Sequence, residues 1–357
     1  MSIIQNGHQF QFGELGIIHD KLPVGNYLLK FNQNTGQFYL QQKEDFILPA
    51  KIYGDHSVVD RWLKSWQENS TKNMGILLDG LKGSGKTITA QKLCIDAQLP
   101  VIMITEGFHG PAFIDFITSP ELGHCIIFID EFEKITENNL EMQRDLLAIM
   151  DGGYMTHLLF VLTTNQDSGL NHYLSNRPGR IRYKKEYSSL DQDIIDAVIA
   201  DLLVYPEHAD SVREFFTRVG MCTFDLLTTI IKEVNLFNQN ALECGSYLNI
   251  YPERVSYEGT IFIGDKKFSG VHTRFTLYSN SKYITIHPSQ EARLYVRGLD
   301  HEIPENDALS DLVDDYDMTL YFDDITLDKQ REALTITHNK TGVKIVLTEQ
   351  KLSSFLA

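Results

Sequence analysis

The sequence has little of what marks several large classes of protein. Its four cysteines are Cys94, Cys125, Cys222 and Cys244. They are far apart and form no CxxC pair, which predicts reduced, mostly buried thiols rather than a disulfide framework or a zinc site. No apolar run approaches the ~20 residues that span a bilayer, and the first ten residues lack the basic start and apolar run of a signal peptide. We therefore expect a cytoplasmic protein with no membrane partner.

Basic residues are also in the minority. The 357 residues include 32 Lys or Arg against 48 Asp or Glu, a formal net charge of −16. Because non-specific affinity for phosphate backbones comes from clustered Lys and Arg, this balance argues against a chain that coats nucleic acid. The 12 histidines show no HExxH or paired spacing, so they predict no metal site. Apolar residues make up 43% of the chain, which is enough for two or three folded units.

The chain divides into four segments by the spacing of its apolar residues. Residues 1–47 are β-rich. In residues 48–187, short apolar runs alternate with helix-like stretches, which is typical of a parallel sheet covered by helices. Residues 188–250 have helical spacing and predict a small helical lid. Residues 251–357 return to a period of two and predict an all-β domain. The expected fold class is thus α/β, with a small β segment before it and a β domain after it.

Two hairpins are predicted at the ends of the chain. The runs 26–31 and 37–42 flank a turn that contains Asn and Gly, and the last hairpin turns at 339–342. Between Tyr251 and this last hairpin, the period-two runs that we interpret as strands include residues 293–298.

The strongest chemical signal is the segment Gly80-Leu81-Lys82-Gly83-Ser84-Gly85-Lys86-Thr87, a full match to GxxxxGK[ST]. A strand-like run enters it and a helix-like run leaves it, which favours a phosphate loop over an ordinary Gly-rich turn. Glycines at 80, 83 and 85 let successive backbone N–H groups point at phosphates, beside the positive end of the helix dipole. We expect Lys86 to reach the β- and γ-phosphates of ATP and Thr87 to place its hydroxyl on Mg²⁺.

Two adjacent acids follow the apolar run 125–129. A fully apolar strand belongs in the middle of a parallel sheet, and such sheets bind ligands at the carboxyl ends of their strands. Asp130 is expected to hold the Mg²⁺ shell. Glu131, on the opposite face of the pleat, is expected to orient and polarise the attacking water. The alternative interpretation is a charged strand exit with no catalytic role.

The next predicted strand, 157–164, leads into Asn165, and an Arg-Pro-Gly-Arg sequence begins at Arg177. Together with the phosphate loop and the Asp-Glu pair, these motifs resemble the AAA subgroup of AAA+ ATPases over about residues 48–236. The resemblance implies that Asn165 is a sensor of the attacking water or γ-phosphate. It also implies that Arg177 and Arg180 are arginine fingers that reach the nucleotide of a neighbouring subunit. A guanidinium suits that role because it stays charged and can stabilise phosphoryl oxygens from outside.

The same resemblance implies a homo-oligomeric ring, with six subunits as the expected number. A plain basic surface patch around Arg182 is the alternative for the two arginines. In family members the position of Tyr53 and Gly54 flanks the adenine, but a buried Tyr at a domain entry explains Tyr53 equally well. Residues 220–226 resemble the start of a late lid helix, with Phe224 where the family has a small residue.

The spacing between the second core strand and the acids is short, with 25 residues from Thr105 to Ile129. This spacing is similar to that of the mitochondrial AAA translocase of the folded Rieske protein. Phe108 in this stretch is either a pore aromatic or a core residue.

The sequence as a whole predicts a Mg²⁺-dependent ATPase whose ring remodels or translocates a macromolecular client, with protein as the expected class. The β-rich ends are interpreted as adaptor modules. One alternative is a nucleic-acid motor or loader, which shares the same nucleotide site. Another is a scaffold that hydrolyses ATP slowly and reports it through assembly.

Overall fold

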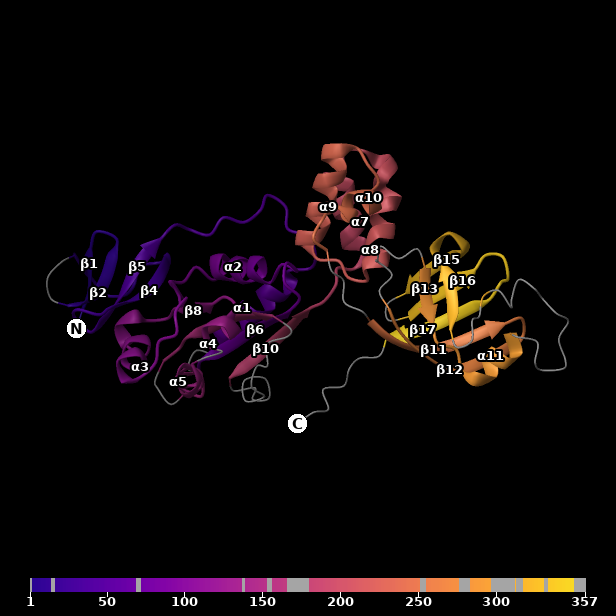
Figure 1. Ribbon diagram of the computed structural model, residues 1–357. Helices are drawn as coiled ribbons and strands as arrows, with labels where there is room; N and C mark the ends of the chain where they lie inside the picture. The colour runs from indigo at the N-terminus through magenta and orange to yellow at the C-terminus, as the bar shows by residue number, and fades with distance from the viewer. Residues whose placement is uncertain are drawn as a thin grey trace. The chain divides into compact units, whose positions relative to one another are not determined.

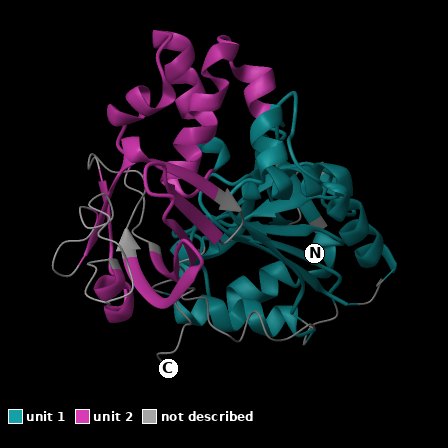
Figure 2. Ribbon diagram, turned by 90° about the vertical axis from the view of Figure 1, so that its right-hand side faces the viewer, with its two compact units in different colours: residues 1–197, 223–226 teal, residues 198–222, 227–357 magenta. Residues whose placement is uncertain are grey.

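The structure is a computed structural model that describes most of the chain. The described residues are 2–13, 17–68, 72–136, 139–152, 156–165, 180–250, 255–275, 283–296, 312, 317–330 and 333–349. The chain divides into two compact units, one with residues 1–197 and 223–226 and the other with 198–222 and 227–357 (Figure 2). Within the described part, no helix is both long and apolar enough to cross a bilayer.

The centre of the first unit is a parallel sheet (Figure 1). Its strands are β6 (Met74–Gly80), β7 (Val101–Met103), β8 (Ile126–Ile129), β9 (Leu159–Asn165) and β10 (Ile181–Tyr187). They lie in the order β10-β6-β9-β8-β7, and every neighbouring pair is parallel. The predicted α/β core is confirmed. This order brings the carboxyl ends of β6, β8 and β9 to one edge, where parallel sheets bind ligands.

Helices cover both faces of this sheet. Helices α1 (Ser57–Glu68) and α2 (Lys86–Ala97) pack on one face through buried side chains that include Trp62 and Leu93. The other face is covered by α3 (Pro111–Ile117), α4 (Phe132–Thr136) and α5 (Leu140–Met150), with a short 3-10 turn at Pro120–Leu122. The central strands are therefore apolar on both faces, which explains why their sequences are continuous runs rather than alternating ones.

The N-terminal strands extend the same sheet. Strand β4 (Asn26–Asn32) pairs in parallel with β7, and β5 (Gln37–Lys43) pairs antiparallel with β4, which confirms the first hairpin. Three strands that the sequence did not reveal follow at the edge: β1 (Ser2–Asn6), β2 (Gln9–Gly13) and β3 (Ile17–His19). The sheet has ten strands in all, so the β-rich N-terminal segment is continuous with the core sheet.

The lid region is helical, as expected. It consists of α7 (Gln192–Leu202), a 3-10 turn (Pro206–His208), α8 (Ala209–Val219), α9 (Phe224–Phe237) and α10 (Ala241–Ser246). Apolar residues recur along one side of α8 and α9, and those on that side, such as Phe215 and Ile230, are buried.

The C-terminal region is a five-stranded antiparallel sheet, in the order β12-β11-β17-β16-β15, with a separate two-stranded pair, β13 and β14. The strands are β11 (Val255–Ile263), β12 (Lys266–Phe275), β13 (Tyr283–Ile286), β14 (Met318–Tyr321), β15 (Ile325–Gln330), β16 (Ala333–His338) and β17 (Lys344–Glu349), with a 3-10 turn at Phe322–Asp324. Strands β16 and β17 form the predicted last hairpin.

The strand prediction for residues 293–298 is wrong. Helix α11 covers Gln290–Val296. Its first turn is closed by Ser289, whose carbonyl accepts from the N–H of Arg293 and whose hydroxyl accepts from the N–H of Ala292. Ala292 is buried in the β-domain core, so packing on one side of a helical turn overrides the local alternation.

Candidate nucleotide-binding site

The phosphate loop joins β6 to α2, and its glycines adopt backbone conformations that other residues avoid. Gly80, Gly83 and Gly85 have φ angles of 134°, 73° and 97°. A Cβ on Gly80 would lie 2.0 Å from the carbonyl oxygen of Tyr187, and one on Gly83 would lie 2.5 Å from the Asp225 carboxylate. The loop therefore needs glycine for close packing as well as for φ. Such a loop turns backbone N–H groups inward toward an anion.

Lys86 begins α2 and is only 7% exposed. Its ammonium donates to the carbonyl oxygens of Gly80 (2.8 Å) and Leu81 (2.7 Å), and to Oδ1 of Asn165 at 3.2 Å. Burial lowers the pKa of Lys86, while nearby carboxylates, with Glu133 first, raise it. The lysine is thus a buried cation held at the mouth of the loop.

The two other polar residues of the loop have different surroundings. The Ser84 side chain is buried and its hydroxyl donates to the Leu81 carbonyl at 2.6 Å, so it braces the loop. Lys82 is exposed, and its charge contributes to lowering the pKa of Glu131.

Thr87 and Asp130 meet as the sequence predicts. The Thr87 hydroxyl lies 3.1 Å and 3.4 Å from the two carboxylate oxygens of Asp130. Hydroxyl and carboxylate oxygens are the donors Mg²⁺ prefers, and Mg²⁺ keeps several waters, so one or two protein ligands suffice. No cluster of three or more His, Cys, Asp or Glu side chains in the described residues is suited to a metal. This pair therefore offers oxygen ligands of the kind that Mg²⁺ binds, and Mg²⁺ binding here stays a prediction.

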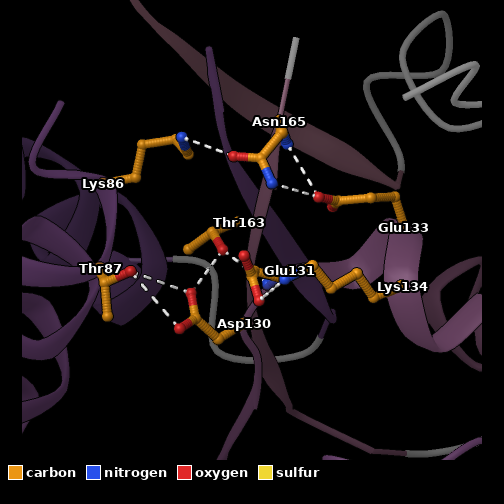
Figure 3. A network of polar contacts seen from close by, with 8 residues as sticks. All are labelled: Lys86, Thr87, Asp130, Glu131, Glu133, Lys134, Thr163 and Asn165. Carbon is orange, nitrogen blue, oxygen red and sulfur yellow. Dashed lines mark hydrogen bonds and ion pairs between the residues drawn. The ribbon is translucent and has the colours of Figure 1, made fainter. Parts of the chain in front are cut away.

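Thr163 ties the two acids together, although sequence reasoning missed it. Its hydroxyl donates to Asp130 Oδ1 at 2.6 Å and accepts from the N–H of Glu131 at 2.9 Å (Figure 3). The sheet register explains this contact, because β8 pairs Ile129 with Leu162 of β9 and the next residues on each strand face each other. A Thr two residues before Asn165 is the only sequence signal for it.

The expected position of Glu131 needs a correction. Strand β8 ends at Ile129, and Glu131 has a φ of 51°, so it lies in a left-handed turn and not on the opposite face of a pleat. Its carboxylate lies 2.5 Å from the ammonium of Lys134, on the first turns of α4. The Lys134 hydrogen bond, ahead of the lesser contribution of Asn165, lowers the pKa of Glu131 below its ordinary value. The turn arises because α4 starts at Phe132 and the chain must leave the strand direction at once.

Asn165 ends β9 directly opposite Gly80 in the register of β6. Its backbone N–H and its Nδ2 both donate to Oε1 of Glu133, at 3.3 Å and 2.5 Å, while its Oδ1 faces Lys86. Glu133 is a second residue that sequence reasoning missed. Its only signal is its place in the Asp-Glu-Phe-Glu sequence after β8.

The two predicted arginine fingers differ in what can be seen of them. Arg177 lies outside the described residues. Arg180 lies just before β10, and its Nε and Nη2 donate to the two oxygens of Asp151 of the same chain, at 2.6 Å and 2.5 Å. This bidentate pair raises the pKa of Arg180. The hydrogen bonds described above for the phosphate loop and for Asn165 do not include Arg180.

Tyr53 and Gly54 lie at the entry to the core. The Tyr53 ring is 6.1 Å from that of Phe224 and has the Lys51 ammonium 5.0 Å from its centroid. Phe224 also packs on the loop, since a Cβ on Gly85 would be 3.6 Å from its ring. Gly54 has a φ of 90°. The aromatic pair thus adjoins the loop, and its contact with an adenine stays a prediction.

Phe108 belongs to the core in this structure. Its ring packs edge-on against Phe38 at 5.2 Å, and it borders the core on the α3 face of the sheet. Core packing, one of the two interpretations open from the sequence, describes it.

The fold and the loop together define a P-loop nucleotide-binding domain. Residues 76–187 match the family described as "ATPase family associated with various cellular activities (AAA)". This part of the chain is an AAA ATPase domain.

Solved structures similar to this chain include the RuvB Holliday junction branch migration motor of Thermotoga maritima. It is 16% identical over 56% of this chain and 71% of its own, with a TM-score of 0.41. One single-residue variant of it is 16% identical over 58% and 75% of the two chains, with a TM-score of 0.42. Another is 18% identical over 56% and 71%, with a TM-score of 0.40.

Proposed function

We propose that the chain is a Mg²⁺-dependent ATPase that assembles into a ring in the cytoplasm and remodels or translocates a protein client. One observation carries the hydrolysis part of this proposal. Side chains from three separate segments, 86–87, 130–134 and 163–165, form two neighbouring groups of polar contacts at the carboxyl edge of the sheet (Figure 3). One group joins Lys86, Asn165 and Glu133, and the other joins Thr87, Asp130, Thr163, Glu131 and Lys134. Polar contacts that only stabilised the fold would not require a glycine-rich phosphate loop beside them, so the two features together favour a nucleotide-binding site.

The roles follow from what each group offers. Lys86 exchanges the carbonyls of Gly80 and Leu81 for phosphate oxygens, which a protonated ammonium binds more strongly. Thr87 and Asp130 hold Mg²⁺, which when bound neutralises charge on the phosphoryl oxygens. Asn165 donates from its amide to the attacking water or the γ-phosphate.

Glu131 is the proposed base. It accepts a proton from the attacking water once its carboxylate is released from Lys134, because an ion pair with Lys134 lowers its basicity. In this arrangement the ion pair with Lys134 keeps Glu131 from acting as a base until ATP and the attacking water occupy the site.

The ring rests on the proposed arginine fingers. Arg177 and Arg180 precede β10, which is an edge strand of the sheet. A neighbouring subunit can approach an edge strand, so we place its nucleotide near these two arginines. The bidentate contact with Asp151 would hold the Arg180 guanidinium in a fixed direction at that edge. Six subunits are the number that the family resemblance suggests.

A second candidate, a nucleic-acid motor or loader, is favoured by one specific feature. A pocket of about 440 Å³ between α1 and β10 is lined by Arg61, Lys64, Ser65, Glu68, Arg182 and Tyr183. A hydrogen bond from Ser65, and then the charges of Arg182 and Arg61, lower the pKa of the Tyr183 hydroxyl. A positive pocket with hydroxyl donors suits phosphate groups, and it stands out in a chain of net charge −16.

Phosphate release in the presence of Mg²⁺ distinguishes the candidates. We expect an unfolded protein to stimulate steady-state turnover more than DNA or RNA does. Stimulation by nucleic acid that disappears in the Arg61→Gln/Arg182→Gln variant would instead support the motor. The matched control is Lys184→Gln, which removes a charge on the same strand from a lysine paired with Asp79 and Glu186. Turnover that none of the three polymers changes would favour the nucleotide-gated scaffold.

A further inference from the structure

Glu133 occupies a place in the site that the assigned motifs leave unexplained. It is the second residue of α4, three residues after Asp130 and two after Glu131. Its Oε1 accepts two hydrogen bonds from a single residue, from the backbone N–H and from the side-chain amide of Asn165 (Figure 3). Two donors from one residue fix that residue's side chain much more tightly than one contact does.

The opposite end of the same amide is also held. Lys86 donates to Asn165 Oδ1, so the amide lies between an ammonium and a carboxylate. Turning it over would put Oδ1 against the Glu133 carboxylate and the NH₂ group against the ammonium, with both contacts repulsive. Glu133 and Lys86 therefore select one of the two amide orientations.

The burial of the Glu133 carboxylate distinguishes its contact with Asn165 from an exposed surface hydrogen bond. Its second oxygen, Oε2, is buried, and none of the described residues donates a hydrogen bond to it. A buried carboxylate oxygen without a donor destabilises the fold, and such a group calls for a functional explanation. Glu133 is also the first of the carboxylates whose charge raises the pKa of Lys86 against the effect of burial.

We propose that Glu133 is a positioning residue of the ATPase site, which sets the amide of Asn165 with its nitrogen toward the acids and its oxygen toward Lys86. The inference rests on the proposed hydrolytic function. Because Glu133 acts through Asn165, its removal should impair turnover and leave nucleotide binding at neutral pH nearly unchanged.

The test is a double-mutant cycle with Glu133→Ala, Asn165→Ala and both changes together, measured by steady-state phosphate release. We expect Glu133→Ala to lower kcat about 10- to 100-fold, the loss of a hydrogen bond to a charged group, with KM for ATP changed less than about threefold. The double variant should be no slower than Asn165→Ala alone. Glu133→Gln, which keeps one acceptor oxygen, should recover most of the turnover. Glu141→Ala is the matched control, because this exposed acid on α5 pairs with His109 and takes no part in the contacts of Asn165 or Lys86 described above.

Two kinetic results would overturn the proposal: full kcat in Glu133→Ala, or losses that simply add in the double variant. A second measurement, the free energy of unfolding of the wild type and the same three variants, does not depend on hydrolysis. The sum of the two single losses should exceed the loss in the double variant, because both single changes remove the same contact. Losses of stability that simply add would also contradict the assigned contact. A wild-type protein that binds Mg·ATP but releases no phosphate refutes the hydrolytic function, and the unfolding measurements then decide on the Glu133 contact alone.

Discussion

Replacing Thr163 by Val tests how the two acids are held, because it removes one hydroxyl and keeps the shape. Thr163 is 1% exposed, so water cannot take the place of the hydroxyl. The change removes a bond to the charged carboxylate of Asp130 and leaves the N–H of Glu131 without its acceptor. A hydrogen bond to a charged group contributes about 1.5–3 kcal/mol, and an unsatisfied buried N–H costs about 1–3 kcal/mol. With partial relaxation, we expect the free energy of unfolding of this unit to fall by about 2–4 kcal/mol.

Tryptophan fluorescence during denaturant unfolding can measure this loss. The chain has two tryptophans, Trp62 and Trp66, and both lie on α1 against the nucleotide-binding sheet. Their signal therefore reports the unit that holds the site. Phosphate release on the same sample should fall about tenfold or more, because Asp130 and Glu131 lose their common support.

The matched control is Thr105→Val, the same change at an exposed position of the same unit. It should change the free energy of unfolding by less than about 0.5 kcal/mol. If Thr163→Val shows the same unfolding midpoint and turnover as the wild type, the hydroxyl does not support the acids and the reasoning is refuted.

Three further predictions concern the same core. Glu131→Gln should bind Mg·ATP normally by titration yet slow phosphate release at least about 100-fold, because the water loses its base; full turnover would remove Glu131 from this role. Since burial lowers the pKa of Lys86 below 10.5, ATP affinity should begin to fall with rising pH earlier than for an exposed lysine, and a flat profile to pH 10.5 contradicts this. Burial raises the pKa of Cys125 and Cys222 to about 12, so a disulfide reagent should modify no thiol at pH 8 before denaturation and all four after it.

Sequence reasoning could find the parts of the site whose residues are close together in the sequence. The phosphate loop and Asp130 are short motifs beside a strand, and their meeting follows from parallel strands ending at one edge. The contacts of Thr163 and Glu133 depend on which strand lies beside β8 and on the turn at Glu131. Neither the strand order nor a positive φ at a non-glycine residue can be read from spacing alone.

The fold shows the same division between local and distant determinants. The hairpin of β4 and β5 is marked by its turn, but the parallel pairing of β4 with β7 joins segments about 75 residues apart, and no local pattern indicates it. The α11 segment has the alternation of a strand and became a helix because Ser289 caps it and Ala292 packs inside. Tertiary packing decided both cases.

The most direct test of the central claim, an ATPase whose sites are completed by a neighbouring subunit, is a mixing experiment. Lys86→Ala loses its own phosphate loop but keeps its arginines, and Arg177→Ala/Arg180→Ala has the opposite defect. Each protein alone should be inactive, since removing an arginine finger typically costs about 10³-fold or more in phosphoryl transfer. Phosphate release measured across mixing ratios, after subunit exchange, should recover where an intact loop meets an intact arginine. Activity at background for every ratio, in mixed assemblies confirmed by two affinity tags, would contradict the account.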